Sequence, residues 1–195
     1  MAASSWVKRW APLAGPGEVL DVACGSGRHA RHFAALGHPV LAVDRDNAAL
    51  AETVASSGAP APITVMAFDL EDGSPWPFEP ARFAAIVVTN YLYRPLFKRL
   101  AASLAPGGLL IYETFAMGNE QFGKPSNPNF LLAPGELLAL ASANGLQVLA
   151  FEDGRVDAPR PAMVQRLVAV APGFARERAW LDAVPGVAPR DSGQE

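Results

Sequence analysis

The stretch of residues 19–30 constrains the fold of this chain more than any other part of it. Residues 19–23 are mostly apolar, as expected of a strand that is covered on both faces of a sheet. Gly25 and Gly27 follow, and glycines let the backbone turn sharply and leave room for a ligand to approach the main chain. The segment after Gly27 opens a helix, whose free N–H groups would face that ligand. The stretch therefore predicts a strand, a glycine turn and a helix that form a binding site.

Asp21 is a carboxylate inside this apolar run. Burying a charge is costly unless the charge has a partner. Because Asp21 lies near the carboxyl end of the predicted strand, it indicates a ligand that brings a positive charge.

Strands and helices are expected to alternate along the chain, which predicts an α/β fold with a largely parallel sheet. Apolar runs predict strands at 19–23, 39–43, 63–68, 83–89, from 109 to 112, 146–151 and 163–170. Helical spacing and turn residues predict helices at 5–14, 29–36, 47–56, 96–104 and 134–143, with a turn at 106–108. The two late strands have no clear helix between them, so we expect an antiparallel hairpin at one edge.

Composition narrows the class of protein. Half of the 195 residues are hydrophobic, which argues against disorder, and the net charge of −3 implies no broad surface for nucleic acid. Cys24 is the one cysteine, which fits a reducing compartment, and no apolar run reaches the roughly 18 residues of a membrane span. We expect a cytoplasmic single domain over 1–195, with its core at 17–171 and a tail at 172–195. A monomer and a homodimer both remain open.

Polar residues stand where the predicted strands end. The first strand ends in the Asp21–Gly27 segment, the next two end on Asp44 and Asp69, and the fourth ends on Thr89 and Asn90. One strand-end aspartate is often only a helix cap or turn former. Three of them beside a glycine turn favour a shared polar ligand, because such sheets bind ligands at the carboxyl ends of their strands.

A nicotinamide or flavin enzyme is the nearest rival among the enzymes. Residues 25–30 match the loose fingerprint G-x-G-x-x-[GA]. However, the charge of Asp21 would repel a pyrophosphate, and the chain is short for a separate substrate domain. A ligand with a nucleoside, no phosphates and an amino-acid tail with a free ammonium group fits better.

Five segments, in order, resemble the motifs of the class I S-adenosylmethionine-dependent methyltransferases. They are the first strand and turn at 19–27, VLAVD at 40–44, FDL at 68–70, FAAIVV at 83–88 and LAPGGLL at 104–110. The resemblance spans residues 18–170. It implies a Rossmann-like, mostly parallel seven-stranded sheet of order 3-2-1-4-5-7-6, with strand 7 antiparallel and helices on both faces. It also implies S-adenosylmethionine as cofactor and S-adenosylhomocysteine as product.

The resemblance also implies a cofactor site. Asp21 and the glycine backbone would hold the methionine end, Asp44 the ribose hydroxyls, and Asp69 and Leu70 the adenine, while a carbonyl of Thr89 or Asn90 would take the ammonium group. The expected cofactor residues are Asp21, Ala23, Gly25, Gly27, His29, Asp44, Arg45, Asp69, Leu70, Thr89 and Asn90.

The acceptor site is expected after the fourth and fifth strands. Tyr91 and Tyr93 are candidate walls of the acceptor pocket, Arg94 a candidate holder of an anionic substrate, and Glu113 a candidate base or orienting group. The competing interpretation is structural: a core tyrosine, a solvated arginine and a capped turn. The long segment 116–132 is a candidate lid, and part of it resembles bacterial methyltransferases near the tellurite-resistance type.

The sequence thus predicts methyl transfer to a small-molecule acceptor by in-line displacement. Such a reaction depends mainly on positioning, and it needs a base only if the acceptor must lose a proton. A methyltransferase acting on RNA or protein is the first alternative, and a non-catalytic module that binds the cofactor or its product is the second. The sequence predicts no metal site and no membrane partner, and it does not favour a nucleic acid.

Overall fold

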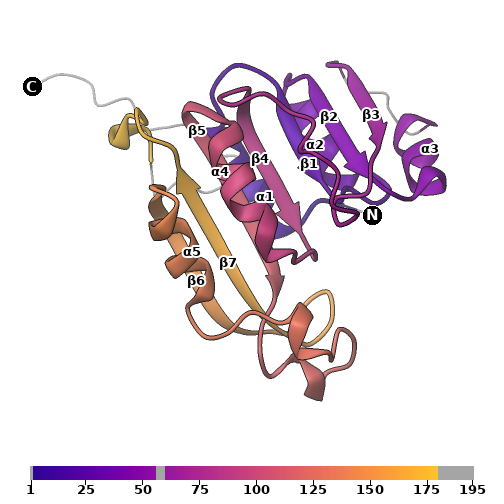
Figure 1. Cartoon of the computed structure of the whole chain (residues 1–195), viewed down its shortest axis with the longest axis vertical. Coiled ribbons are helices and arrows are strands. Elements are labelled where there is room, and N and C mark those ends of the chain that lie inside the picture. Colours follow the sequence, from indigo (N-terminus) through magenta and orange to yellow (C-terminus); the bar gives the residue numbers. More distant parts are fainter. Residues whose placement is uncertain (1, 56–59, 180–195) are drawn as a thin grey trace, which may run out of the picture.

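A computed structural model describes residues 2–55 and 60–179 of the chain, and it contains a seven-stranded sheet of order β3-β2-β1-β4-β5-β7-β6 (Figure 1). β7 runs antiparallel to both of its neighbours, and the other neighbouring pairs are parallel. This arrangement confirms the predicted fold, including the late hairpin. The strands are β1 (Val19–Val22), β2 (Val40–Asp44), β3 (Ile63–Ala67), β4 (Phe83–Thr89), β5 (Leu104–Phe115), β6 (Gln147–Val156) and β7 (Ala162–Val170).

Helices cover both faces of the sheet, as expected. One face packs against α4 and α5 through Leu100 and Leu137, and the other packs against α1, α2 and α3 through Trp6, Phe33 and Leu50. The two layers of apolar side chains explain why β1 and β4 are apolar on both faces. The helices are α1 (Ser5–Trp10), α2 (Arg28–Ala35), α3 (Asn47–Ala55), α4 (Phe97–Ser103) and α5 (Glu136–Ala143).

The structure corrects several expected boundaries. β5 begins at Leu104 rather than 109, because the predicted turn at 106–108 is an irregularity within the strand. Gly107 adopts a φ of +71° there and donates its N–H to the Pro172 carbonyl, so the strand continues past it. The N-terminal helix changes to a 3-10 turn at Ala11–Leu13, where Pro12 removes a backbone donor. The described residues do not include Ser56, where the third helix was predicted to end, or residues 180–195, which make up most of the predicted tail.

Segment 116–132 extends beyond the carboxyl ends of β4 and β5 (Figure 1). It contains two 3-10 turns, Asn119–Gln121 and Pro128–Phe130. Its two ends are joined, because Leu132 donates to the Phe115 carbonyl and accepts from the Met117 N–H. The segment is therefore anchored at its base, and its role as a lid stays a prediction. Across residues 2–55 and 60–179, no helix combines the length and the apolar character that crossing a membrane requires.

Candidate functional site

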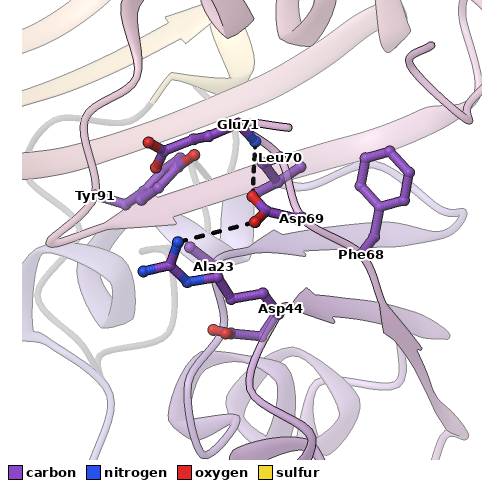
Figure 2. Close-up of a pocket in the computed structure, with 8 residues that line it drawn as sticks. Ala23, Asp44, Phe68, Asp69, Leu70, Glu71 and Tyr91 are labelled. Atoms are coloured by element: carbon purple, nitrogen blue, oxygen red, sulfur yellow. Dashed lines mark hydrogen bonds and ion pairs between the residues drawn. The ribbon is translucent and has the colours of Figure 1, made fainter. Parts of the chain in front are cut away.

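A cavity of about 250 Å³, here called the first cavity, lies where β1, β2 and β3 end (Figure 2). Three parallel strands that end side by side bring loops far apart in sequence to one edge of the sheet. Five residues that the sequence assigned to the cofactor line this cavity. Phe68 and Glu71, which the sequence did not single out, line it too, as does Tyr91, which the sequence assigned to the acceptor. The lining residues are Ala23, Asp44, Arg45, Phe68, Asp69, Leu70, Glu71 and Tyr91.

Asp44 connects the first cavity to the glycine turn. One of its carboxylate oxygens accepts the Gly25 N–H at 2.8 Å, and the other accepts the Asp46 N–H at 2.9 Å. An ionised carboxylate has about four acceptor sites, so roughly two remain for a ligand. The side chain thus fixes the turn and keeps the capacity to accept two hydroxyl groups.

The glycine turn is built for close approach. Gly25 has a φ of +52°, and a Cβ added there would meet no heavy atom within 4 Å. Gly27 has a φ of +70°, and a Cβ there would overlap the buried side chain of Thr53. Ala23 also has a positive φ, +52°, beside the cavity. The first glycine therefore leaves open space for a ligand, while the second lets the turn pack against α3.

The rim of the first cavity is acidic. Asp69 accepts the Glu71 N–H at 2.9 Å and lies 3.9 Å from the Arg45 guanidinium, so the loop after β3 is held in a tight turn (Figure 2). Three carboxylates, those of Asp44, Asp69 and Glu71, face a single guanidinium among the lining residues. This balance favours a ligand with positive charge over one with phosphates.

Asp21 does not line either cavity described here, and its partner is the protein itself. Its side chain is only 1% exposed and accepts the Ala30 N–H at 2.8 Å, inside the first turn of α2. Burial raises the pKa of this carboxyl from 3.8 to about 7, although the bond to Ala30 opposes the shift. Asp21 therefore occupies the anion position at the start of α2, and its contact with the cofactor stays a prediction.

Exchanging Asp21 for asparagine is expected to remove a pH dependence of stability. Because the folded pKa lies above the unfolded one, the stability associated with Asp21 is complete below about pH 4 and falls as the pH rises to about 7. A shift of this size corresponds to on the order of 4 kcal/mol, or roughly 10 °C in Tm. Thermal unfolding of the wild type and of Asp21→Asn between pH 4 and pH 8 measures the difference. Parallel curves for the two proteins would contradict the assignment, and Glu79→Gln serves as an exposed control.

His29 is buried between the N-terminal segment and the end of β4. The Ser4 N–H donates to its Nε2 at 3.3 Å, so the ring proton is on Nδ1, which lies 3.2 Å from the Thr89 hydroxyl. Burial lowers the pKa of His29 to about 3, so the ring is neutral at physiological pH. His29 lines neither cavity; it connects the start of α1 to the strand end where the ammonium group is expected.

A second cavity, of about 240 Å³, adjoins the first and is lined partly by the same residues. Tyr91 and Glu71 line both cavities, and Asn90, with a φ of +56°, lines only the second. The other lining residues come from the loop after β4, from β5 and from segment 116–132. They are Leu92, Thr114, Phe115, Pro125 and Phe130. None of these five was a predicted site residue, although Pro125 and Phe130 lie in segment 116–132, whose length marked it as a candidate lid.

The structure places Arg94, the predicted holder of an anionic substrate, in an ion pair within the protein. Its guanidinium pairs with both carboxylate oxygens of Glu136 and donates to the carbonyls of Asn129 and Leu131, each at 2.9 Å. This ion pair holds the pKa of Glu136 below its usual range. Arg94 thus connects the loop after β4 to α5 and to segment 116–132, and four of its five N–H donors are bonded within the protein, so its contact with a substrate stays a prediction.

The two remaining acceptor-site candidates also lie outside the second cavity. Tyr93 packs against the apolar layer under α4 and α5 and lines neither cavity. Glu113 is buried and pairs with Arg166 of β7 at 2.9 Å, and burial raises its pKa despite that arginine. Neither residue lines the two cavities described here, so both predicted contacts with the acceptor stay predictions. Tyr91 is the one acceptor candidate that the structure places at a cavity, and burial together with Glu71 raises its pKa.

Comparison with known proteins identifies a matching domain and a shared fold. A family model described as a methyltransferase domain matches residues 19–108. A search of curated proteins gives no significant match. Among solved structures, an S-adenosylmethionine-dependent methyltransferase from Methanosarcina mazei is 16% identical, with 88% of this chain and 99% of that one covered and a TM-score of 0.67.

Two further structures have the same fold. An S-adenosylmethionine-dependent methyltransferase from Mesorhizobium loti is 20% identical, with 84% of this chain and 95% of that one covered and a TM-score of 0.66. TehB from Haemophilus influenzae is 17% identical, with 87% and 62% covered and a TM-score of 0.71. Residues 19–108 therefore match a methyltransferase domain, and the chain has the same fold as these solved methyltransferase structures.

Proposed function

We propose that this protein transfers a methyl group from S-adenosylmethionine to a small-molecule acceptor, with the cofactor in the first cavity and the acceptor in the second. The observation that carries the proposal is that two cavities meet at Tyr91 and Glu71. A donor and an acceptor bound on either side of this junction would lie close enough for direct transfer. The single buried Cys24, without a disulfide, is in keeping with a cytoplasmic site of action.

The first cavity fits the cofactor by the chemistry of its residues. Asp44 has acceptor capacity for the two ribose hydroxyls, and Leu70 and Phe68 offer apolar surface to a flat ring. The open space at Gly25 leaves room for the amino-acid tail to approach the backbone. S-adenosylmethionine, the cofactor that the methyltransferase-domain match and the shared fold support, meets each of these requirements.

The same residues disfavour a nicotinamide or flavin dinucleotide. Such a cofactor places its pyrophosphate at the start of the helix after the glycine turn. In this chain Asp21 already accepts the Ala30 N–H there. The three carboxylates around the first cavity add repulsion toward phosphates.

When bound, S-adenosylmethionine supplies an electrophilic methyl group on a positively charged sulfur. The contribution of the protein is to hold the acceptor on the far side of that methyl group and to exclude water, since orientation alone removes much of the barrier. Tyr91 would position the acceptor as a neutral phenol, because its raised pKa keeps the proton on the oxygen. Glu71 is the one lining residue of the second cavity that could accept a proton if the acceptor must lose one.

The size of the second cavity bears on whether the methyl acceptor is a small molecule, an RNA or a protein. At about 240 Å³ it lies near the lower end of ligand pockets, which suits a small molecule better than a nucleotide of RNA. A protein side chain remains the stronger macromolecular alternative. A non-catalytic binding module would need the first cavity but would have no use for the second.

Substituting Phe130 by alanine is expected to separate acceptor binding from cofactor binding. Phe130 is half exposed and lines only the second cavity, so its loss costs little stability while it removes one wall. We expect kcat/KM for an acceptor, found by screening for S-adenosylhomocysteine release, to fall about 10-fold, as for the loss of roughly 1.4 kcal/mol of contact. The dissociation constant of S-adenosylhomocysteine, measured by calorimetry, should stay within about twofold.

Met117→Ala is the matched control, because Met117 is equally exposed, belongs to the same segment and lines neither cavity. Equal losses in the two variants would contradict the placement of the acceptor. Calorimetric titration of the wild type with NAD tests the rival function. Binding of NAD without binding of S-adenosylmethionine or S-adenosylhomocysteine would overturn the proposal.

A further inference from the structure

The second cavity has a charge balance that the sequence did not predict. Arg94 was expected to bring a positive charge to the acceptor, but its guanidinium is engaged by Glu136 and by two backbone carbonyls. Among the residues that line the cavity, Glu71 is the only one with a charged side chain. An anionic acceptor would therefore lose bonds to water when it binds here, and it would be repelled by the carboxylate of Glu71.

The remaining lining is aromatic and aliphatic. Tyr91, Phe115 and Phe130 bring three rings to the cavity, and Leu92 and Pro125 add apolar surface. Aromatic ring faces attract cations, and the attraction is stronger where the site excludes water. A carboxylate beside several aromatic rings is a combination that favours an ammonium group attached to an apolar body.

Besides Arg94, the cations of Arg160 and Lys124 lie near the cavity without lining it. The Arg160 guanidinium is 5.9 Å from the ring centre of Phe115 and donates to the carbonyl of Lys124, the residue before Pro125. Both side chains are exposed, as is Glu71, so water and salt weaken the effect of all three, but only Glu71 lines the cavity itself. The Phe115 ring already has a cation near it. The carboxylate of Glu71 and the rings of Tyr91 and Phe130 are therefore the groups left for a bound ammonium group.

We infer that the methyl acceptor is a small apolar molecule that carries an amine or another positively charged group, and that Glu71 selects it over anionic molecules of the same size. This inference rests on the proposed function, since it assigns the second cavity to the acceptor. The charged group is a recognition element, and the inference does not depend on which acceptor atom receives the methyl group. The volume of about 240 Å³ limits the acceptor to roughly one ring with a short side chain.

Three matched probes test the inference. Phenethylamine, 2-phenylethanol and 3-phenylpropionate have the same ring and nearly the same length, and they are respectively positive, neutral and negative at pH 7.5. Their dissociation constants are measured by calorimetry on the full chain, both free and saturated with S-adenosylhomocysteine. We expect the amine to bind about 10-fold more tightly than the carboxylate, with the alcohol between them, and the ratio to shrink in 0.5 M salt.

Glu71→Gln removes the charge of Glu71 and keeps the size of its side chain. In this variant the ratio between amine and carboxylate should fall to about 1–2, mostly through weaker amine binding. Glu79→Gln, an equally conservative change later in the same loop, lines neither cavity and should keep the wild-type ratio.

Each outcome is decisive for the inference. Equal or reversed binding of amine and carboxylate, binding of neither probe, or a ratio unchanged in Glu71→Gln would overturn it. Failure of S-adenosylhomocysteine to bind would overturn the proposed function instead. The probe ratio on the free protein would then still report on Glu71, so the two failures can be told apart.

Discussion

Replacing Asp44 by alanine is expected to weaken binding of S-adenosylmethionine and S-adenosylhomocysteine by at least about 100-fold. Hydrogen bonds to a charged group contribute roughly 1.5–3 kcal/mol each, and every 1.4 kcal/mol is a factor of ten in affinity. The substitution removes the acceptor for the ribose and also frees the Gly25 N–H, which is 2.8 Å from Asp44. Both effects act on the first cavity, so the loss should appear for the cofactor and its product alike.

Asp46→Ala is the control for this prediction. Asp46 is two residues away and caps the start of α3 by accepting the N–H groups of Ala48 and Ala49, but it does not line the first cavity. Its loss should lower Tm by a few degrees while changing the affinity by less than about threefold. Calorimetric titration and thermal unfolding of both variants supply the comparison. Similar affinity losses for Asp44→Ala and Asp46→Ala would show that the loop, and not the carboxylate of Asp44, accounts for the effect.

Much of the fold could be predicted because its signals are local. Within each segment the signals lie only a few residues apart. The apolar run of β1 is followed closely by its glycines, β2 ends on an aspartate, and another aspartate comes two residues after β3. A parallel sheet brings these ends together without further information, so Asp44, Asp69 and Leu70 meet at one cavity as expected. The limits of β5 were wrong because proline and glycines usually mark turns, whereas here Gly107 pairs with Pro172, far along the chain.

The acceptor side could not be predicted with the same success, because its contacts join distant residues. Arg94 has the charge to bind an anion, but Glu136, 42 positions later, folds against it. Glu113 is similarly paired with Arg166 of a neighbouring strand. A single sequence shows which residues carry charge, but the partner of each charge depends on the register of β5 with β7 and on the path of segment 116–132.

Alanine substitutions at Gly25 and Gly27 are expected to fail in different ways. Both residues have positive φ, so alanine adds a strain of roughly 1–2 kcal/mol at either position. At Gly25 the new methyl group meets no protein atom within 4 Å and projects into space that the cofactor would need. We expect Gly25→Ala to lose about 100-fold in affinity for S-adenosylhomocysteine and only a few degrees in Tm.

At Gly27 the new methyl group would instead overlap Thr53, which is fully buried. The Thr53 hydroxyl donates hydrogen bonds to the Gly25 and Ala49 carbonyls. Gly27→Ala should therefore lower the free energy of unfolding by about 3–4 kcal/mol, of which overpacking accounts for the part beyond strain. The double variant Gly27→Ala with Thr53→Ala tests the cause. Once the Thr53 hydroxyl and methyl groups are gone, Gly27→Ala should lower the free energy of unfolding less in the Thr53→Ala protein than it does in the wild type. Denaturant unfolding gives the stability of all four proteins in the cycle. If the two single changes in the free energy of unfolding simply add in the double variant, then the overlap with Thr53 is not the cause of the loss, because residues that interact depart from additivity.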